Sequence, residues 1–330
     1  AVDVLFGDAN PSGKLAETFQ KHLNDNINSA YFPMGTKNVQ YRESVYVGYR
    51  YFDSANKPVR YPFGFGLSYT TFEYSNLKVS SDTITDADVL TVTFDVKNTG
   101  KVAGAEVSQV YVKDVKSTIF RPEKELKGFD KVYLEPSETK TITITLDKRA
   151  FAFYNVLVHD WTVESGEFEI LVGASSRDIK LSHVVTVNAP AVQIKDYSKE
   201  APSYYDIASA TELPIEEFSA VYGAEVPENI PPKRGKFDIN STVDEVSITG
   251  FGKFLKKVLV FGAKILTKGA ANQMMAVNSI VTMPLRSFSG FTGGLVSESS
   301  VDGLVDIFNK KKGGFRKFLK GFKKSKKPQR

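Results

Sequence analysis

Apolar and polar residues alternate through much of the region 72–188, and this period of two predicts short strands that bury one face. The alternation is clearest in two segments, and three shorter runs add to it: 89–97, 139–146, 106–112, 167–172 and 180–187. Turn-forming residues separate the runs at 98–100, 135–137 and 165–166. Strands at this spacing predict a two-sheet β-sandwich, with Trp161 and Phe168 as large core side chains.

The pattern becomes helical in residues 241–330. The segment Ser241-Thr242-Val243-Asp244-Glu245 places a hydroxyl and a carboxylate three positions apart, as a capping box requires. Apolar residues then recur at helical spacing over 254–266, and a second short helix is predicted over 299–308. Because lysines interrupt the first of these segments, it cannot be a membrane span.

The other two regions are less regular. Residues 1–71 begin with an apolar run at 2–6 that predicts a strand, and continue into a segment rich in Tyr and Arg. Since that run has no partner ahead of it, we expect the chain to begin inside a domain. Residues 189–240 are rich in proline, which predicts a linker or an extended arm.

The amino-acid composition excludes some kinds of chemistry but says little about the fold. A hydrophobic share of 42% and a charged share of 25% are ordinary for a globular protein. Cysteine is absent, which excludes disulfides and thiolate chemistry. The three histidines lie far apart, so we expect no metal site.

Charge is distributed unevenly along the chain. Residues 251–330 hold 17 Lys and Arg against 3 Asp and Glu, whereas residues 1–250 hold 26 against 35. The net charge of +5 therefore comes from the tail alone, and we expect no nucleic-acid partner.

Several motifs appear in an order that is typical of one family. GDANPSGKL at 7–15, YRESVYVGYRYFD at 41–53 and YPFGFGLSYTTF at 61–72 resemble the C-terminal region of the family 3 glycoside hydrolases, many of them β-glucosidases or β-xylosidases. RPEKELKGF at 121–129 and VGASS at 172–176 are similar to the fibronectin type III-like domain of that family. MPLRS at 283–287 resembles a tail found on some bacterial members.

The resemblance implies a mainly β fold class in four parts. Residues 1–71 would be the end of an α/β sandwich domain with its connecting segment, and 72–188 a fibronectin type III-like, immunoglobulin-like β-sandwich. An extended Pro-rich linker would follow at 189–240 and a basic helical extension at 241–330.

The resemblance also implies a reaction that this chain cannot perform alone. Retaining glycosidases use two carboxyl groups, one as nucleophile and one as proton donor. In the family these come from a (β/α)8 barrel and from the α/β sandwich, both ahead of residue 1, so we expect no catalytic residue here. The implied partners are those upstream parts and a β-glycoside substrate, and no cofactor is implied.

Tyr41, Arg42 and Glu43 are the only substrate-rim candidates that the residues suggest. Aromatic faces stack on sugars and carboxylates accept sugar hydroxyls, and Asp53 lies in a similar setting. We favour the structural interpretation, in which Glu43 pairs with a nearby arginine and the tyrosines pack domains together.

The basic tail is a candidate for a membrane surface. Residues 310–330 hold 11 Lys and Arg and no acid. An apolar stripe amid these cations would suit a helix lying on anionic lipid, through Phe315, Arg316, Lys317, Phe318, Lys320, Phe322, Lys323 and Lys324. The favoured alternative is that this helix docks on the protein body, because nearby glycines weaken an isolated helix.

Two functions follow as hypotheses. The first is a non-catalytic C-terminal fragment of a β-glucosidase-like hydrolase, and the second is a stand-alone module that binds carbohydrate or a membrane surface. The sequence does not fix the compartment; we favour the cytoplasm, with a peripheral membrane location as the alternative.

Overall fold

The computed structural model describes residues 2–32 and 38–324, with side chains up to residue 321. These residues form two compact units. The sandwich unit contains the described residues up to 32 and those from Val39 to Pro227. The helical unit contains Asn38 and the described residues from Glu228 onward. Each unit has its own core.

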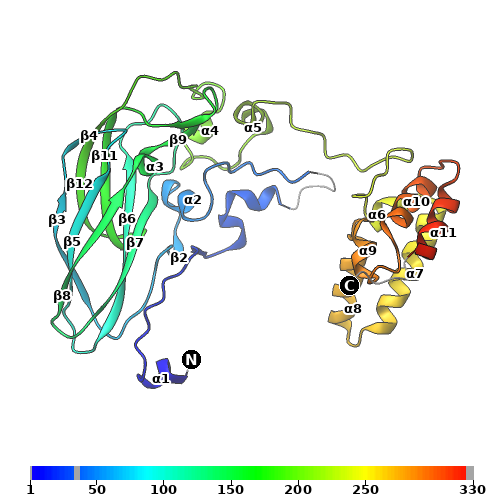
Figure 1. Ribbon diagram of the computed structural model, residues 1–330, viewed down its shortest axis with the longest axis horizontal. Helices are drawn as coiled ribbons and strands as arrows, with labels where there is room; N and C mark the ends of the chain where they lie inside the picture. Colours follow the sequence, from blue (N-terminus) through cyan, green and yellow to red (C-terminus); the bar gives the residue numbers. More distant parts are fainter. Residues whose placement is uncertain (1, 33–37, 325–330) are drawn as a thin grey trace. The chain divides into compact units, whose positions relative to one another are not determined.

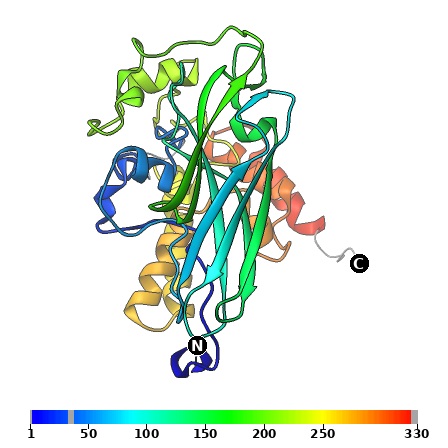
Figure 2. The ribbon, with the colours of Figure 1, turned by 90° about the vertical axis from the view of Figure 1, so that its left-hand side faces the viewer.

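Two antiparallel sheets face each other in the sandwich unit (Figure 1 and Figure 2). One sheet has the order β3-β5-β8, formed by Phe72–Val79, Leu90–Asn98 and Thr139–Leu146. The other has the order β4-β12-β11-β6-β7, formed by Thr83–Thr85, Asp178–Asn188, Gly166–Ser175, Gly104–Asp114 and Glu125–Leu134. Only β4 pairs in parallel, with β12. The predicted strands and the predicted sandwich are thus confirmed.

Every second residue of the central strands points inward and fills the space between the two sheets. Along β5, Leu90, Val92 and Phe94 have no exposed surface, whereas the threonines between them pair across β8 on the outer face. This is the alternation that the sequence displays. Phe168 is fully buried, as predicted, and its ring meets Phe151 edge to face.

Trp161 does not reach the centre of the core. It lies on β10 (Asp160–Thr162), which pairs with β9 (Phe153–Asn155) after the short helix α3 (Lys148–Phe151). The indole packs against the margin of the core and is stacked by Arg149, whose guanidinium lies 3.5 Å from the ring centroid. This small hairpin folds outside the two main sheets, so the residue is only partly covered.

A second core joins the segment before the sandwich to the arm after it. Elements before the sandwich are β1 (Phe19–Gln20), η1 (Leu23–Asp25), η2 (Ile27–Ala30), α2 (Tyr49–Ser54) and β2 (Val59–Tyr61). The arm carries α4 (Pro202–Tyr205) and α5 (Ile215–Tyr222). Aromatic side chains from both parts bury one another around Phe120, including Tyr46, Tyr51, Phe52, Tyr197 and Tyr204.

The strand predicted at 2–6 is wrong. Val2–Phe6 forms a short helix, α1, whose apolar side chains are all exposed or half-exposed. A strand needs a neighbour to satisfy its backbone groups, and no described strand pairs with this segment. The backbone therefore bonds to itself in a helical turn.

The helical unit consists of α6 (Val243–Val246), α7 (Gly250–Leu266), α8 (Ala270–Val281), α9 (Ser287–Phe291), α10 (Glu298–Phe308) and α11 (Gly314–Lys324). Its core includes Val243, Val246, Leu285, Leu304 and Phe308. The capping box is confirmed, since Thr242 and Glu245 bond each other's backbone N–H groups. None of the described helices is long and apolar enough to cross a membrane.

Candidate functional site

Arg42 does not line an open surface. Its side chain is buried, its Nε donates to Gln40 Oε1 at 2.8 Å, and its Nη1 donates to the backbone oxygen of Leu213 at 3.0 Å. The guanidinium also lies over the ring of Tyr31, 4.4 Å from the centroid. Arg42 therefore fastens the arm to the segment before the sandwich, while Tyr41 beside it is exposed.

Glu43 is buried without a cation. Only 7% of its surface is exposed, its Oε2 accepts no hydrogen bond, and no arginine among the described residues pairs with it. The predicted Glu43–arginine pair is therefore wrong. Burial raises the pKa of the Glu43 carboxyl above its usual value, against a smaller opposing effect of its own backbone N–H.

Asp53, at the end of α2, holds this helix to the sandwich. Its Oδ1 accepts from Arg177 Nε at 2.6 Å, and its Oδ2 lies 3.5 Å from Lys124 Nζ. The same arginine donates to the backbone oxygens of Phe52 and Lys57 at 2.8 and 2.9 Å. Asp53 and its two cations therefore act as a clamp between the second family-like motif and the sandwich.

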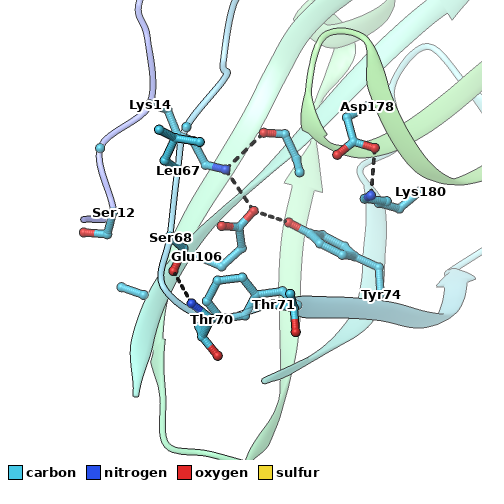
Figure 3. Close-up of a pocket in the computed structure, with 15 residues that line it drawn as sticks. Ser12, Lys14, Leu67, Ser68, Thr70, Thr71, Tyr74, Glu106, Asp178 and Lys180 are labelled. Atoms are coloured by element: carbon cyan, nitrogen blue, oxygen red, sulfur yellow. Dashed lines mark hydrogen bonds and ion pairs between the residues drawn. The ribbon is translucent and has the colours of Figure 1, made fainter. Parts of the chain in front are cut away.

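A second clamp lies in a cavity of about 250 Å³ at the first motif (Figure 3). Lys14 Nζ donates to Glu106 Oε1 at 3.0 Å and to the backbone oxygen of Ala174 at 3.2 Å. The Tyr74 hydroxyl donates to the same carboxylate oxygen at 2.9 Å. Burial, followed by the neighbouring Glu106 charge, raises the pKa of Tyr74, which keeps this donor protonated.

Two motifs approach each other closely beside this cavity. A Cβ on Gly66 would lie 2.5 Å from the backbone oxygen of Gly13. The glycine at position 66 therefore allows backbone to meet backbone where the first and third motifs cross.

A larger cavity of about 510 Å³ lies beside the β9–β10 hairpin. On its wall Glu125 is shared by Arg50 at 3.3 Å, Arg121 at 3.4 Å and Lys127 at 3.3 Å. Burial acts to raise the pKa of Glu125, but these three cations together hold it below its usual value. A carboxyl group whose pKa is lowered in this way is a poor proton donor.

Most of these carboxylates hold parts of the chain together. Asp53 and Glu106 bind cations that are distant in sequence, Glu125 binds Arg50 and its near neighbours Arg121 and Lys127, and Glu245 caps α6, whereas no cation in the described part of the chain faces Glu43. A retaining glycosidase needs two carboxyl groups on one glycosidic oxygen. Among the described residues, Asp53, Glu106 and Glu125 are each occupied instead by cations of the chain itself.

The sequence did not reveal either clamp. Lys14 and Glu106 lie 92 positions apart, and Asp53 and Arg177 lie 124 apart. Their only signal is that Lys14 and Asp53 belong to the family-like motifs.

The tail residues divide between two environments. Phe318 packs against α10, where Gly303 provides the space, and Lys317 pairs with Asp302 and Asp306 at 3.5 and 3.4 Å. Phe315, Arg316 and Lys320 are exposed. The side chains of Phe322, Lys323 and Lys324 lie outside the described residues.

Two family models match the chain. The glycosyl hydrolase family 3 C-terminal domain matches residues 1–69, and the fibronectin type III-like domain matches residues 106–176. Both clamps join these matched segments or the strands beside them.

Known proteins align with the chain over part of their own length. Thermostable β-glucosidase B of Acetivibrio thermocellus is 44% identical over 93% of the chain, which covers 36% of that protein. An exo-α-(1→6)-L-arabinopyranosidase of Bifidobacterium breve is 49% identical over 56% of the chain and 24% of its own length.

Solved structures agree. A β-glucosidase of Bifidobacterium adolescentis shares 41% identity with a TM-score of 0.55, over 67% of this chain and 31% of that one. A Kluyveromyces marxianus β-glucosidase shares 45% identity with a TM-score of 0.53, over 56% of this chain and 23% of that one.

Proposed function

Since this chain belongs to the family 3 glycosyl hydrolases and corresponds to their C-terminal region, we propose that it is the non-catalytic part of an enzyme that removes terminal β-linked sugars. The relatives named β-glucosidase make a β-D-glucoside the proposed substrate. The nucleophile and the proton donor would come from a barrel and an α/β domain supplied upstream, which would be the partners of this chain.

The observation that carries this proposal is the pair of clamps, whose carboxylates Asp53 and Glu106 are buried. Lys14–Glu106 and Asp53–Arg177 tie the region matched by the family 3 model to the sandwich. Removing one member of a buried ion pair leaves an uncompensated charge, so such pairs hold their partners in one arrangement. We therefore propose that the sandwich braces the segment that completes the upstream domain.

Release of nitrophenol from nitrophenyl β-D-glucoside tests the proposal. We expect no release by this chain alone, and release when the chain is joined to the sequence encoded upstream of it. Absence of an upstream barrel, together with glycan binding by the folded chain, would favour the stand-alone module instead. Release of nitrophenol by the chain alone would contradict both the proposed function and the stand-alone module.

We also propose that the helical unit contacts an anionic membrane surface. Phe315 and Leu319 are exposed on α11 beside the exposed cations Arg316 and Lys320, although Phe318 is turned toward α10. Each basic residue near anionic lipid contributes about 1 kcal/mol. Because anionic lipids face the cytoplasm, we propose a cytoplasmic, membrane-peripheral location.

Sedimentation with vesicles tests this second proposal. The chain should pellet with phosphatidylcholine vesicles only when they also contain phosphatidylglycerol. Removal of residues 310–330 should weaken pelleting if α11 contributes, and unchanged pelleting would remove α11 from the contact.

A further inference from the structure

The helix α7 exposes an apolar stripe along its whole length. Phe254, Val258, Phe261 and Ile265 recur at helical spacing and are exposed by 62%, 50%, 67% and 64%. These four residues are called the outer stripe of α7. Monomeric proteins rarely expose apolar residues in so continuous a patch, so such a patch marks an interaction surface.

The outer stripe is not needed for the fold of the unit. The opposite side of α7 packs Leu255 and Leu259 against the core of the helical unit, and Ala263 is buried there. Thr249 caps the start of the helix, and its hydroxyl accepts from the N–H of Gly252. Packing and capping thus already account for the helix, which leaves the outer stripe available for a partner.

The charges around the outer stripe have one sign. Lys253, Lys257 and Lys264 are exposed on α7, and no acid among the described residues pairs with them. From 250 to 297 the sequence contains six Lys and Arg and no Asp or Glu. Any partner of this face must therefore combine an apolar interior with negative charge at its edge.

The neighbouring helix extends the same chemistry. α8 lies beside α7 as the second arm of a hairpin (Figure 1), and its Met274 and Met275 are exposed. Flexible apolar side chains adapt to irregular apolar surroundings. The acid-free, apolar region is therefore a property of the α7–α8 hairpin and not of one helix turn.

An anionic bilayer meets both requirements. A helix with an apolar face bordered by lysines lies in the membrane interface, with its apolar side chains at the acyl boundary and its ammonium groups at the head groups. A second copy of this chain would instead bring like charges together.

We propose that α7 lies flat on anionic lipid, with the outer stripe below the head groups and Lys253, Lys257 and Lys264 among them. This inference rests on the membrane contact proposed above, but it assigns the insertion to α7, which is complete and packed, and leaves α11 as an auxiliary contact.

The test compares the intact chain with matched double variants in vesicle sedimentation. Phe254→Ser with Phe261→Ser should weaken binding to phosphatidylcholine–phosphatidylglycerol vesicles at least about tenfold, because each ring loses its burial in the acyl region. The control, Phe129→Ser with Tyr133→Ser, alters two similarly exposed aromatics of β7 and should bind like the unaltered chain. Far-ultraviolet circular dichroism verifies that the variants keep their helices.

A charge series tests the second part of the proposal. Lys253→Glu with Lys257→Glu should weaken binding at least about tenfold, whereas Lys97→Glu with Lys101→Glu, an equal change of charge on the sandwich unit, should weaken it less. Equal binding to vesicles with and without phosphatidylglycerol would overturn the proposal.

The remaining outcomes separate the two membrane proposals. If no variant and no unaltered chain binds anionic vesicles, both fail. If binding survives the α7 variants but is lost on removing residues 310–330, the assignment to α7 fails and the contact through α11 stands. If the chain binds but the same chain joined to its upstream sequence does not, the outer stripe is an interface within the enzyme, and the proposal is overturned.

Discussion

The sandwich unit encloses a continuous apolar core and fastens its flanking segments with ion pairs, whereas α7 of the helical unit leaves a whole apolar stripe and lysines beside it exposed. Phe94 on β5 has no exposed surface, and Asp53 is held by two cations. Phe254 and Phe261 on α7 are more than half exposed, and the lysines beside them have no acidic partner among the described residues. The ion pairs of the first unit hold its segments together, and the exposed stripe of the second is the surface for which we propose a partner.

The same substitution, Phe to Ala, should give the largest difference in stability between the two units. Phe94→Ala should destabilise the sandwich by about 3–5 kcal/mol, because it leaves a cavity in a closed core. Phe254→Ala on α7 should change stability by no more than about 0.5 kcal/mol. Urea denaturation measures both, with Trp161 fluorescence reporting on the sandwich and circular dichroism on the helices. Comparable losses would show that α7 is covered.

The Asp53 clamp should have the next largest effect. Asp53→Ala removes the carboxylate that Lys124 and Arg177 share, which leaves the buried Lys124 with only the exposed Glu123 at 3.6 Å among its described partners, and should cost about 3 kcal/mol in the free energy of unfolding. Asp82→Ala is the control, because Asp82 pairs with His183 at the surface and its side chain is 81% exposed. Its effect on the free energy of unfolding should stay below about 1 kcal/mol. Urea denaturation followed by Trp161 fluorescence measures both, and similar losses would contradict the assigned clamp.

The capping box sharpens the comparison inside the helical unit. Thr242→Ala removes the side-chain acceptor for the Glu245 N–H and should destabilise the unit by about 1 kcal/mol. Thermal unfolding followed at a helical wavelength should show the loss, while the Trp161 signal should not move. A shift of both signals by the same amount would mean that the two units unfold together.

The smallest effect concerns pH. Because burial raises the pKa of Glu43, the folded state favours the neutral acid. Stability from this group is therefore complete below the ordinary glutamate pKa and is lost as pH rises through the raised value. Glu43→Gln should flatten this decline in urea titrations at several pH values, and Glu73→Gln, at an exposed position, should leave it unchanged. A decline that persists in Glu43→Gln would assign it to another group.

Local patterns predicted the sandwich well. The alternation at β5 and β8 and the Thr242–Glu245 box are properties of neighbouring residues, so the sequence displays them directly. The strand predicted at Val2–Phe6 was wrong because a local pattern alone did not decide it. A short apolar run is equally compatible with a strand and with a short helix, and only a neighbouring strand distinguishes them.

Long-range pairing could not be predicted. Nothing near Asp53 marks Arg177 as its partner, and nothing near Glu43 shows that burial leaves it without a cation. The apolar stripe predicted for the tail does not lie in one environment, since Phe318 packs against α10 whereas Phe315 is exposed. These outcomes depend on which surfaces meet, which a one-dimensional pattern does not contain.

We propose that Asp53 and Glu106 brace the enzyme of which this chain would be a part, and that neither they nor Glu43 take part in its reaction. The most direct test of this proposal is kcat for nitrophenyl β-D-glucoside, measured on the chain joined to its upstream sequence with Asp53→Asn, Glu106→Gln or Glu43→Gln. We expect each substitution to change the unfolding temperature and to leave kcat unchanged at temperatures below it. A fall in kcat of about a hundredfold or more with the fold intact, as expected on losing a catalytic acid or base, would contradict it.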